Sequence, residues 1–465
     1  MKKYLILLLF LSLFTSCSVG PRTITYDLVS LTEDHTVGIA SNPFSATGSL
    51  LSRIKVFTAE TLWRVHIKCF GYPLLNPVIP IISKDRKFLN KDKFNKWLDR
   101  KITKTVKGDI RTFVSGDNFF PVLEKNILNA NKFINISTYI FDNDKYGIFF
   151  ADLLKEKSKT VQVKVVIDLL GSAGAWDISD DKAGLSSMES KHMFYYLTEN
   201  SKIKLRKSKN IWLASDHVKI ISIDGDKIFF GGMNIGNEYR YEWRDMMFEV
   251  KGDLVKEFQE IFDSAWAKHR HFADFLRFFK KKLKKEIPKQ NIGDTDFHIL
   301  KTTTYKQEIY AAQIEAVRRA KHHIYVENPY IWNETFIYEL CAARNRGVDV
   351  RVTIPGDFDA KSFAGINKKV TNVFLKYGIR VYIYPGTSHI KAASYDGWVC
   401  FGTANYDDLS LHKNYEVNLA TSDPLFSEKF ERDVLIKGQN ISTEQIEPFT
   451  IEMSDRITYE LKDFF

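Results

Sequence analysis

Two hydrophobic patterns alternate along the chain, and they occur twice in the same order. In the first half, the apolar run 134–141 reads as a strand, 147–157 as a helix with one apolar face, and 161–167 as a second strand. The second half has strand patterns at 323–330 and 348–354 and helix patterns at 311–320 and 335–344. Strands that alternate with helices require crossover connections. The pattern therefore predicts an α/β fold, with a mixed, largely parallel sheet flanked by helices in each half.

The repetition indicates a duplicated domain. Its period is far longer than the roughly 20 to 50 residues of a solenoid repeat. A chain of 465 residues is also too long for one compact core. We divide it into a signal-like segment (1–17), an N-terminal basic region of unknown role (18–107), a first repeat (108–275), a basic linker (276–295), a second repeat (296–440) and a C-terminal segment (441–465).

The first residues have the pattern of an export signal. Lys2 and Lys3 precede an apolar run at 5–14, and Cys17 follows small residues. The run is too short to cross a hydrocarbon core of about 30 Å as a helix. The segment resembles a bacterial lipoprotein signal with a lipidated Cys17, although Phe14 stands where leucine is usual. This interpretation predicts attachment to a membrane of the cell envelope on the exported side; plain secretion and an uncleaved anchor are the alternatives.

Positive charge is in excess and is concentrated in two stretches. Lys and Arg number 67 against 57 acidic residues, which gives a net charge of +10 and favours anionic partners. Residues 84–107 are densely basic with interleaved aromatic residues such as Phe94 and Trp97, and residues 272–289 follow the same pattern. Each stretch has the composition of an element that lies on an anionic membrane. A solvated helix or a plain connector has the same composition.

The remaining cysteines do not suggest a disulfide framework. Cys69, Cys341 and Cys400 are odd in number, and the last two lie within apolar or helical patterns. They are expected to be small buried hydrophobic residues. Their spacing does not indicate a metal site.

Each repeat ends in the same short motif. His217 and Lys219 are followed by Asp224 and then by Gly231, Gly232, Met233 and Asn234; the second copy comprises His389, Lys391, Asp396, Gly402, Thr403, Ala404 and Asn405. A single His-x-Lys pair would be weak support for a site. Two copies with matching offsets, each at the end of a matching repeat, indicate one catalytic site in a single chain.

Strand geometry explains the spacing. Residues i and i+2 of a strand share a face, so the histidine and lysine of each copy point the same way. Glycine-rich turns let the backbone approach an anion, and Asn234 and Asn405 are candidate phosphate donors. If the repeats pack about a pseudo-two-fold axis, both His-Lys pairs face one phosphate. Two histidines and two lysines then supply a nucleophile, an acid and fixed positive charge without a metal or cofactor.

Residues 108–440 resemble the phospholipase D superfamily and, within it, the bacterial cardiolipin synthase-like proteins. The short runs 139–143, 243–245, 327–330 and 414–416 are similar to that group as well. The resemblance implies two α/β domains forming a bilobal sandwich and a phosphohistidine intermediate. It also implies His217 as the nucleophile and His389 as the general acid and later base, although the symmetric motif permits the reverse. Gly232 and Thr403 depart from the usual serine.

Carboxylates recur at matching offsets in the two copies. Asp245 lies 28 residues after His217 and Glu416 lies 27 after His389. A catalytic imidazole needs a carboxylate on its second nitrogen, so we assign Asp245 to His217 and Glu416 to His389. The alternative is that both carboxylates pair with surface lysines. Asp224 and Asp396 complete the catalytic motif, but their position at strand-turn junctions favours a structural role.

Three functions are compatible with the motif. The first is transfer of a phosphatidyl group, with phosphatidylglycerol as the expected substrate and a lipid alcohol as acceptor, which gives cardiolipin; water as acceptor gives phosphatidic acid. The second is an exported nuclease, because the same chemistry cleaves nucleic acid and the net charge would bind it. The third is a basic membrane-binding protein with a dead site. The complete set of histidines, lysines and asparagines argues against the third.

Overall fold

The computed structural model describes residues 39–73, 89–173, 192–270, 293–357 and 363–462. Within it the chain divides into two units. Unit 1 comprises Met1–Leu50, Ile110–Glu242 and Met247–Ile292, and unit 2 comprises Leu51–Asp109, Trp243–Met246 and Gly293–Phe465. The short segment Trp243–Met246 thus lies in the first repeat by sequence but belongs to unit 2.

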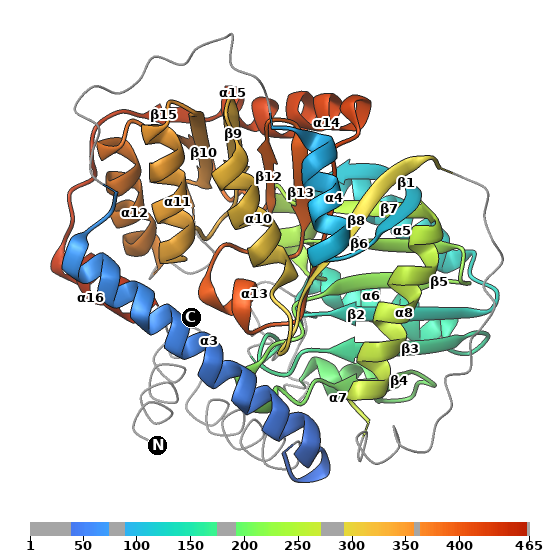
Figure 1. Ribbon diagram of the computed structural model, residues 1–465. Coiled ribbons are helices and arrows are strands. Elements are labelled where there is room, and N and C mark those ends of the chain that lie inside the picture. Colours follow the sequence, from blue (N-terminus) through green and yellow to red (C-terminus); the bar gives the residue numbers. More distant parts are fainter. Residues whose placement is uncertain (1–38, 74–88, 174–191, 271–292, 358–362, 463–465) are drawn as a thin grey trace. The chain divides into compact units, whose positions relative to one another are not determined.

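The strands of unit 1 form one mixed sheet in the order β7-β6-β5-β2-β3-β4 (Figure 1). Their bounds are β2 (Phe133–Thr138), β3 (Gln162–Ile167), β4 (Lys204–Lys207), β5 (Lys219–Ile223), β6 (Lys227–Gly231) and β7 (Met246–Gly252). β2, β3 and β4 are parallel neighbours. β5 and β6 join them in antiparallel orientation, as does β7.

Helices pack on this sheet through apolar faces. They are α5 (Gly116–Leu128), α6 (Lys145–Lys157), α7 (Met193–Thr198) and α8 (Asp253–Lys268), with short helical turns η1 (Ile211–Leu213) and η2 (Glu238–Glu242). α8 contacts β2, β5 and β6. Its buried residues Leu254, Phe258 and Phe262 recur at the four-residue spacing of one helix face, which explains this packing.

Unit 2 has a corresponding sheet with the order β15-β11-β10-β9-β12-β13-β14-β8. Its strands are β8 (Thr295–Thr302), β9 (His323–Glu327), β10 (Asp349–Pro355), β11 (Arg380–Tyr384), β12 (Ala392–Tyr395), β13 (Trp398–Gly402), β14 (Glu416–Thr421) and β15 (Thr443–Gln445). β9, β10 and β11 are parallel, and the other neighbouring pairs are antiparallel. The first residues of β1 (Thr105–Val114) pair with β8 in antiparallel orientation.

The helices of unit 2 surround a large apolar core. They are α4 (Lys91–Lys101), α10 (Glu308–Arg319), α11 (Glu334–Asn345), α12 (Ala364–Lys376), α13 (Asp408–His412), α14 (Pro424–Phe430), η4 (Glu431–Ile436), α15 (Lys437–Ile441) and α16 (Met453–Leu461). α3 (Pro43–Phe70) begins in unit 1 and ends in unit 2. Cys341 and Cys400 are buried in this core without a disulfide, as expected, and Cys69 is exposed.

The prediction of largely parallel sheets was wrong for the part of each unit that carries the motif. Each motif forms an antiparallel hairpin whose turn contains Asp-Gly, with left-handed backbone at Asp224 (φ 57°) and Asp396 (φ 52°). Asp-Gly is a strong hairpin signal because both residues tolerate positive φ. The first turn holds three residues between the paired Ile223 and Lys227, and the second holds two between Tyr395 and Trp398. This extra residue accounts for the one-residue difference in motif offsets.

The basic stretch 84–107 contains a helix that packs on the body of unit 2. Phe94 and Leu98 of α4 are fully buried, and Phe94 contacts Trp398 edge-on at 5.1 Å. The apolar face of α4 is therefore part of the core, and its charged face is the one presented outward. No helix among the described residues is long and apolar enough to cross a membrane. Cys17 and the stretch 272–289 lie outside the described residues.

Candidate active site

The first half-site lies at the start of β5 in unit 1. His217 precedes the strand and Lys219 is its first residue. The buried Lys219 ammonium donates to the backbone oxygen of His217 at 3.0 Å. The ring of Tyr139 contacts the His217 ring edge-on at 4.7 Å and lies 5.2 Å from the Lys219 ammonium. The lysine charge is thus held beside the imidazole.

The second half-site in unit 2 repeats this arrangement. Lys391, which directly precedes β12, is buried and donates to the backbone oxygen of His389 at 2.7 Å. The Nδ1–H of His389 donates to Asp245 Oδ2 at 2.6 Å, and both side chains are buried. The sequence assigned Asp245 to His217, so that pairing was wrong. With Nδ1 held by a carboxylate, Nε2 is the nitrogen through which His389 would react.

The position of Asp245 follows from the segment Trp243–Met246. Its backbone exchanges hydrogen bonds with the residues before His389: Arg244 N–H donates to Thr387 O at 3.0 Å, and His389 N–H donates to Arg244 O at 2.8 Å. The Trp243 ring lies 5.1 Å from the His389 ring. The other carboxylate oxygen of Asp245 accepts from the Met246 N–H at 2.7 Å, which fixes the rotamer.

Glu416 is fixed by the turn of its own repeat. Thr403 Oγ1 donates to Glu416 Oε2 at 2.5 Å and accepts from the Val417 N–H at 3.0 Å. Gly402 is needed at this turn because a Cβ there would lie 2.4 Å from Val417 O. The sequence assigned Glu416 to His389, whose Nδ1 is already bound to Asp245. That assignment was therefore also wrong.

The residue before His217 belongs to a buried network that the sequence did not reveal. Asp216 accepts from His269 Nε2 at 2.5 Å, and its backbone N–H donates to Asp168 Oδ2 at 2.6 Å. Asp168 also accepts from Ser208 and Asn210. Burial raises the pKa of Asp216, but Lys268 and His269 together lower it below its usual range. Burial and Lys268 lower the pKa of His269 to about 4.

The residue before His389 is anchored by different groups. Ser388 Oγ donates to Glu327 Oε1 at 2.6 Å, and the Arg244 guanidinium donates to the same carboxylate at 3.1 Å. Both anchoring carboxylates follow or end a parallel strand, Asp168 after β3 and Glu327 in β9. The sign of these carboxylates in the sequence is an acidic residue at the end of an apolar strand pattern, separated along the chain from the motif histidine.

The two asparagines of the motif are not equivalent. Asn234 Oδ1 accepts from the Ile140 N–H at 3.0 Å, and its Nδ2 donates to Tyr239 Oη at 2.9 Å. Asn405 Oδ1 has no hydrogen-bond donor among the described residues. Phosphate binding by both side chains stays a prediction; Asn234 would contribute through its remaining amide hydrogen.

The motif aspartates lie at the opposite end of their strands from the His-Lys pairs. Asp224 accepts from the backbone of Asn131, Lys132 and Phe133 at 2.7 to 3.0 Å. Burial raises the pKa of Asp224, but these N–H donors hold it below its usual value. Asp396 accepts from four backbone N–H groups in the same way: those of Leu89, Lys321, His322 and His323. These contacts support the structural role favoured by the sequence.

Metal ligands do not gather at either half-site. Within the described ranges, no three His, Cys, Asp or Glu side chains are placed to hold a metal ion. The chemically competent groups that the structure positions are thus imidazoles, ammonium groups and carboxylates.

The duplicated His-Lys half-sites on two similar α/β units define an enzyme of phospholipase D type. A family model described as "Cardiolipin synthase, PLD-like domain" matches residues 123–266 and 313–435. The chain belongs to this family, and the two matched stretches correspond to the two repeats.

Named relatives agree with this assignment. The chain is 28% identical over 343 residues to a cardiolipin synthase of Clostridium perfringens, covering 71% of this chain and 70% of that protein. It is 27% identical over 412 residues to a probable cardiolipin synthase of Bacillus subtilis, covering 78% and 79%. Among solved structures, a phosphatidylserine synthase of Haemophilus influenzae shares the fold, with a TM-score of 0.60 and 13% identity, over 80% of this chain and all of that one.

Proposed function

We propose that the protein transfers a phosphatidyl group between phospholipids through a phosphohistidine intermediate, forming cardiolipin from two molecules of phosphatidylglycerol. The observation that carries the proposal is the buried His389–Asp245 pair beside Lys391, because a histidine held this way suits proton transfer to and from an alcohol. The matching His217–Lys219 pair supplies the second imidazole. The family membership supports the lipid substrate.

In the proposed first step, His217 attacks the phosphorus of phosphatidylglycerol. The bond to the glycerol oxygen breaks, and His389 gives its Nε2 proton to that oxygen, so that free glycerol leaves. Asp245 stabilises the imidazolium form of His389 before this transfer. Lys219 and Lys391 supply fixed positive charge for the phosphate oxygens in a buried setting, where such charge has its largest effect.

In the second step, His389, now neutral, takes the proton from the hydroxyl group of a second phosphatidylglycerol. The resulting oxygen attacks the phosphorus on His217, and the P–N bond breaks to release cardiolipin. Water in place of the lipid alcohol gives phosphatidic acid by the same route. We further propose that Glu416 orients His217, because Asp245 serves His389 and the two carboxylates occupy matching positions in the repeats.

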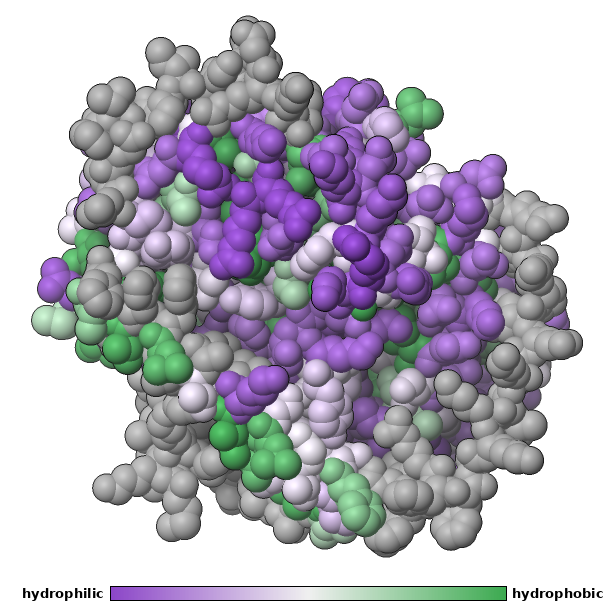
Figure 2. Space-filling model, in the orientation of Figure 1, coloured by the Kyte–Doolittle hydropathy of each residue, from purple (hydrophilic) through white to green (hydrophobic). Residues whose placement is uncertain are grey.

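We propose that this reaction takes place at a membrane of the cell envelope. Apolar side chains are exposed along the part of α3 in unit 2, including Leu51, Ile54, Leu62 and Val65, and Figure 2 shows this apolar surface. Such side chains bind at a lipid interface. Lipidation at Cys17 would add an anchor.

The anchor has a direct test. Cys17→Ala should abolish incorporation of labelled fatty acid and shift the protein from the membrane to the soluble fraction. Ser18→Ala is the matched control, because it changes the neighbouring residue and keeps the thiol. Equal membrane recovery and equal labelling of both variants would contradict lipidation at Cys17.

The central experiment is incubation of the purified protein with labelled phosphatidylglycerol, with and without added glycerol, and in the presence of excess chelator. We expect labelled cardiolipin, suppressed by glycerol because glycerol returns the intermediate to substrate, and unchanged by chelator. Phosphatidic acid alone would indicate hydrolysis in place of transfer. No lipid product in the wild-type protein would overturn the proposed function, and abolition by chelator would overturn the metal-free mechanism.

A further inference from the structure

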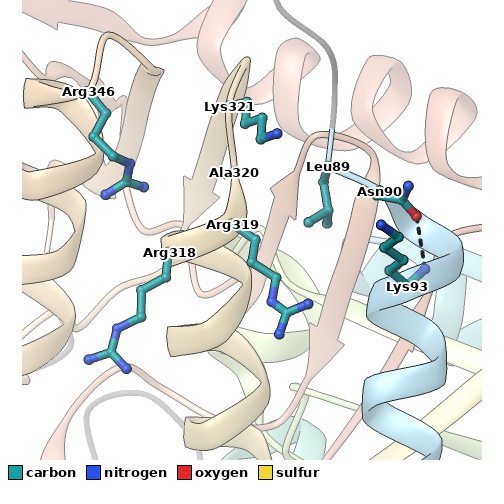
Figure 3. A pocket seen from close by; sticks show the side chains of 8 residues that line it. All are labelled: Leu89, Asn90, Lys93, Arg318, Arg319, Ala320, Lys321 and Arg346. Atoms are coloured by element: carbon teal, nitrogen blue, oxygen red, sulfur yellow. Dashed lines mark hydrogen bonds between the residues drawn. The ribbon is translucent and has the colours of Figure 1, made fainter.

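A cavity of about 360 Å³ in unit 2 is lined by cationic side chains. Figure 3 shows Lys93, Arg318, Arg319, Lys321 and Arg346 around it, together with Leu89, Asn90 and Ala320. They come from the start of α4, the end of α10, the segment before β9 and the residue after α11. Among the described residues, the lining includes no carboxylate, and the surface over α4 and α10 is hydrophilic in Figure 2.

Three of the cations are held in place from outside the cavity. Arg318 donates twice to Glu339 at 2.6 and 2.8 Å, and Arg319 donates twice to Glu315 at 2.5 and 2.7 Å. Arg346 donates to Val317 O at 2.7 Å. A guanidinium has five N–H donors, so Arg318 and Arg319 keep donors beyond those bonds while their geometry is fixed.

The two lysines add further charge to the lining. Among the described residues, Lys93 and Lys321 form no ion pair. The first turn of α4 also faces this region, because Asn90 caps it and lines the cavity. A helix N-terminus carries partial positive charge. Glu315 and Glu339 pair with two of the five cations, and the Asp396 carboxylate accepts from the backbone of Leu89 and Lys321, so the cations still outnumber the carboxylates among these described residues.

We propose that this cavity binds a phosphate group, either of an anionic lipid headgroup or of a soluble phosphate ester. Fixed guanidinium groups match the oxygens of a phosphate, and ammonium groups supply further charge. The volume lies within the range of small-molecule sites, which is roughly 300 to 1,000 Å³.

The site is distinct from the candidate active site. Asp396 accepts from the backbone of Leu89 and Lys321, which both line the cavity. His389 lies seven residues before Asp396, on the other side of β12 and three residues before that strand begins. At about 3.3 Å per residue of extended chain, the separation is at most about 23 Å. Occupation of the cavity therefore neither needs nor blocks the catalytic imidazole.

The test compares two double variants of the full-length protein. Lys93→Gln/Lys321→Gln removes the two cavity lysines, and Lys101→Gln/Lys104→Gln removes the same net charge at exposed positions at and just after the C-terminal end of α4. Binding of inorganic phosphate is measured by calorimetry, and binding to vesicles of phosphatidylglycerol in phosphatidylcholine by co-sedimentation at the same ionic strength. Thermal unfolding checks that both variants fold.

We expect the cavity variant to bind at least tenfold more weakly than the control variant in at least one arm, because it loses two well-placed positive charges. A difference in the phosphate arm alone assigns a soluble phosphate ester, and a difference with vesicles assigns a lipid headgroup. Indistinguishable variants in both arms overturn the proposal. Neither arm requires turnover, so this result is independent of the proposed function.

Discussion

The two half-sites contain the same histidine and lysine groups, but different neighbouring residues hold them in place. In both, the lysine ammonium donates to the backbone oxygen of the histidine two residues earlier. Before His217, however, stands the ionised Asp216, bound to His269, whereas before His389 stands the neutral Ser388, bound to Glu327. The two copies of the motif therefore share their backbone geometry, but the charge around each histidine differs. Unequal surroundings are what separate nucleophile and acid roles require.

The loops that follow β2 and β9 differ in a related way. The Asp142 N–H donates to Ile235 O, and the Trp332 N–H donates to Tyr406 O, so Asp142 and Trp332 occupy equivalent positions. The Trp332 indole N–H donates to Asn367 Oδ1 at 2.6 Å. Burial, with Asp144 and Glu238 nearby, raises the pKa of Asp142 to about 8. The first repeat therefore holds a carboxyl that is protonated at neutral pH where the second holds an indole.

Replacing each histidine is expected to have the largest effect. His217→Ala and His389→Ala should each lower turnover by roughly 10⁴-fold or more, as loss of a nucleophile or its base does elsewhere. With a p-nitrophenol ester as substrate, which needs no acid for its leaving group, His389→Ala should accumulate labelled phosphohistidine at His217, detected by mass spectrometry after rapid quenching. Label on His389 in the His217→Ala variant would reverse the roles. His322→Ala is the matched control, because this histidine lies directly before β9, at the end of the strand away from Glu327.

Variants of Asp245 and Glu416 test whether each motif histidine is oriented by the carboxylate of the other repeat. Asp245→Asn and Glu416→Gln should each lower turnover of the lipid by roughly 10³- to 10⁴-fold, because the imidazole loses its orienting acceptor. With the p-nitrophenol ester, the first step should be rescued in Asp245→Asn, seen as a burst of p-nitrophenol, since His389 is not needed there as an acid, but it should not be rescued in Glu416→Gln. Equal rescue of both variants would refute the assignment of Glu416 to His217. Glu428→Gln, on exposed α14, is the control.

The hydroxyl group of Thr403 has no counterpart at Gly232. Thr403→Val removes the donor to Glu416 and should lower turnover about tenfold, with about 1 to 3 kcal/mol lost from the free energy of unfolding, since the Val417 N–H also loses its acceptor. Thr403→Ser keeps the hydroxyl and should retain near-normal turnover. If valine and serine variants turn over equally, the hydroxyl does not position Glu416.

The smallest expected effect is a pH-dependent gain in stability. Between about pH 4 and 8 the folded protein keeps the Asp142 proton that the unfolded chain releases, so this group makes stability fall as pH rises through that window. Asp142→Asn removes this dependence. The variant's advantage in urea unfolding should therefore grow from pH 5 to pH 8. Asn333→Asp, in the second repeat, should instead destabilise, because it places a carboxyl against Asp408. A constant difference across the pH range would contradict the raised pKa.

The local elements and the motif could be predicted from the sequence, because they depend on patterns within a few residues. The helix expected at 147–157 is α6 at Lys145–Lys157, and the strand expected at 161–167 is β3 at Gln162–Ile167. The partner of Asp245 could not be predicted, because equal offsets show which positions are equivalent and not which histidine each carboxylate reaches. His269 is 53 residues from Asp216, and no local pattern links them. The antiparallel hairpins were predictable from Asp-Gly.

The transfer of Trp243–Met246 to unit 2 has a consequence for how the duplicated gene could evolve. A chain cut between the repeats would leave His389 on one fragment and its carboxylate on the other. Neither fragment would carry a complete histidine–carboxylate pair at His389 until the two reassociated. Substitutions near residue 245 in the first copy would impair the half-site at His389 in the second copy. The two copies must therefore diverge together.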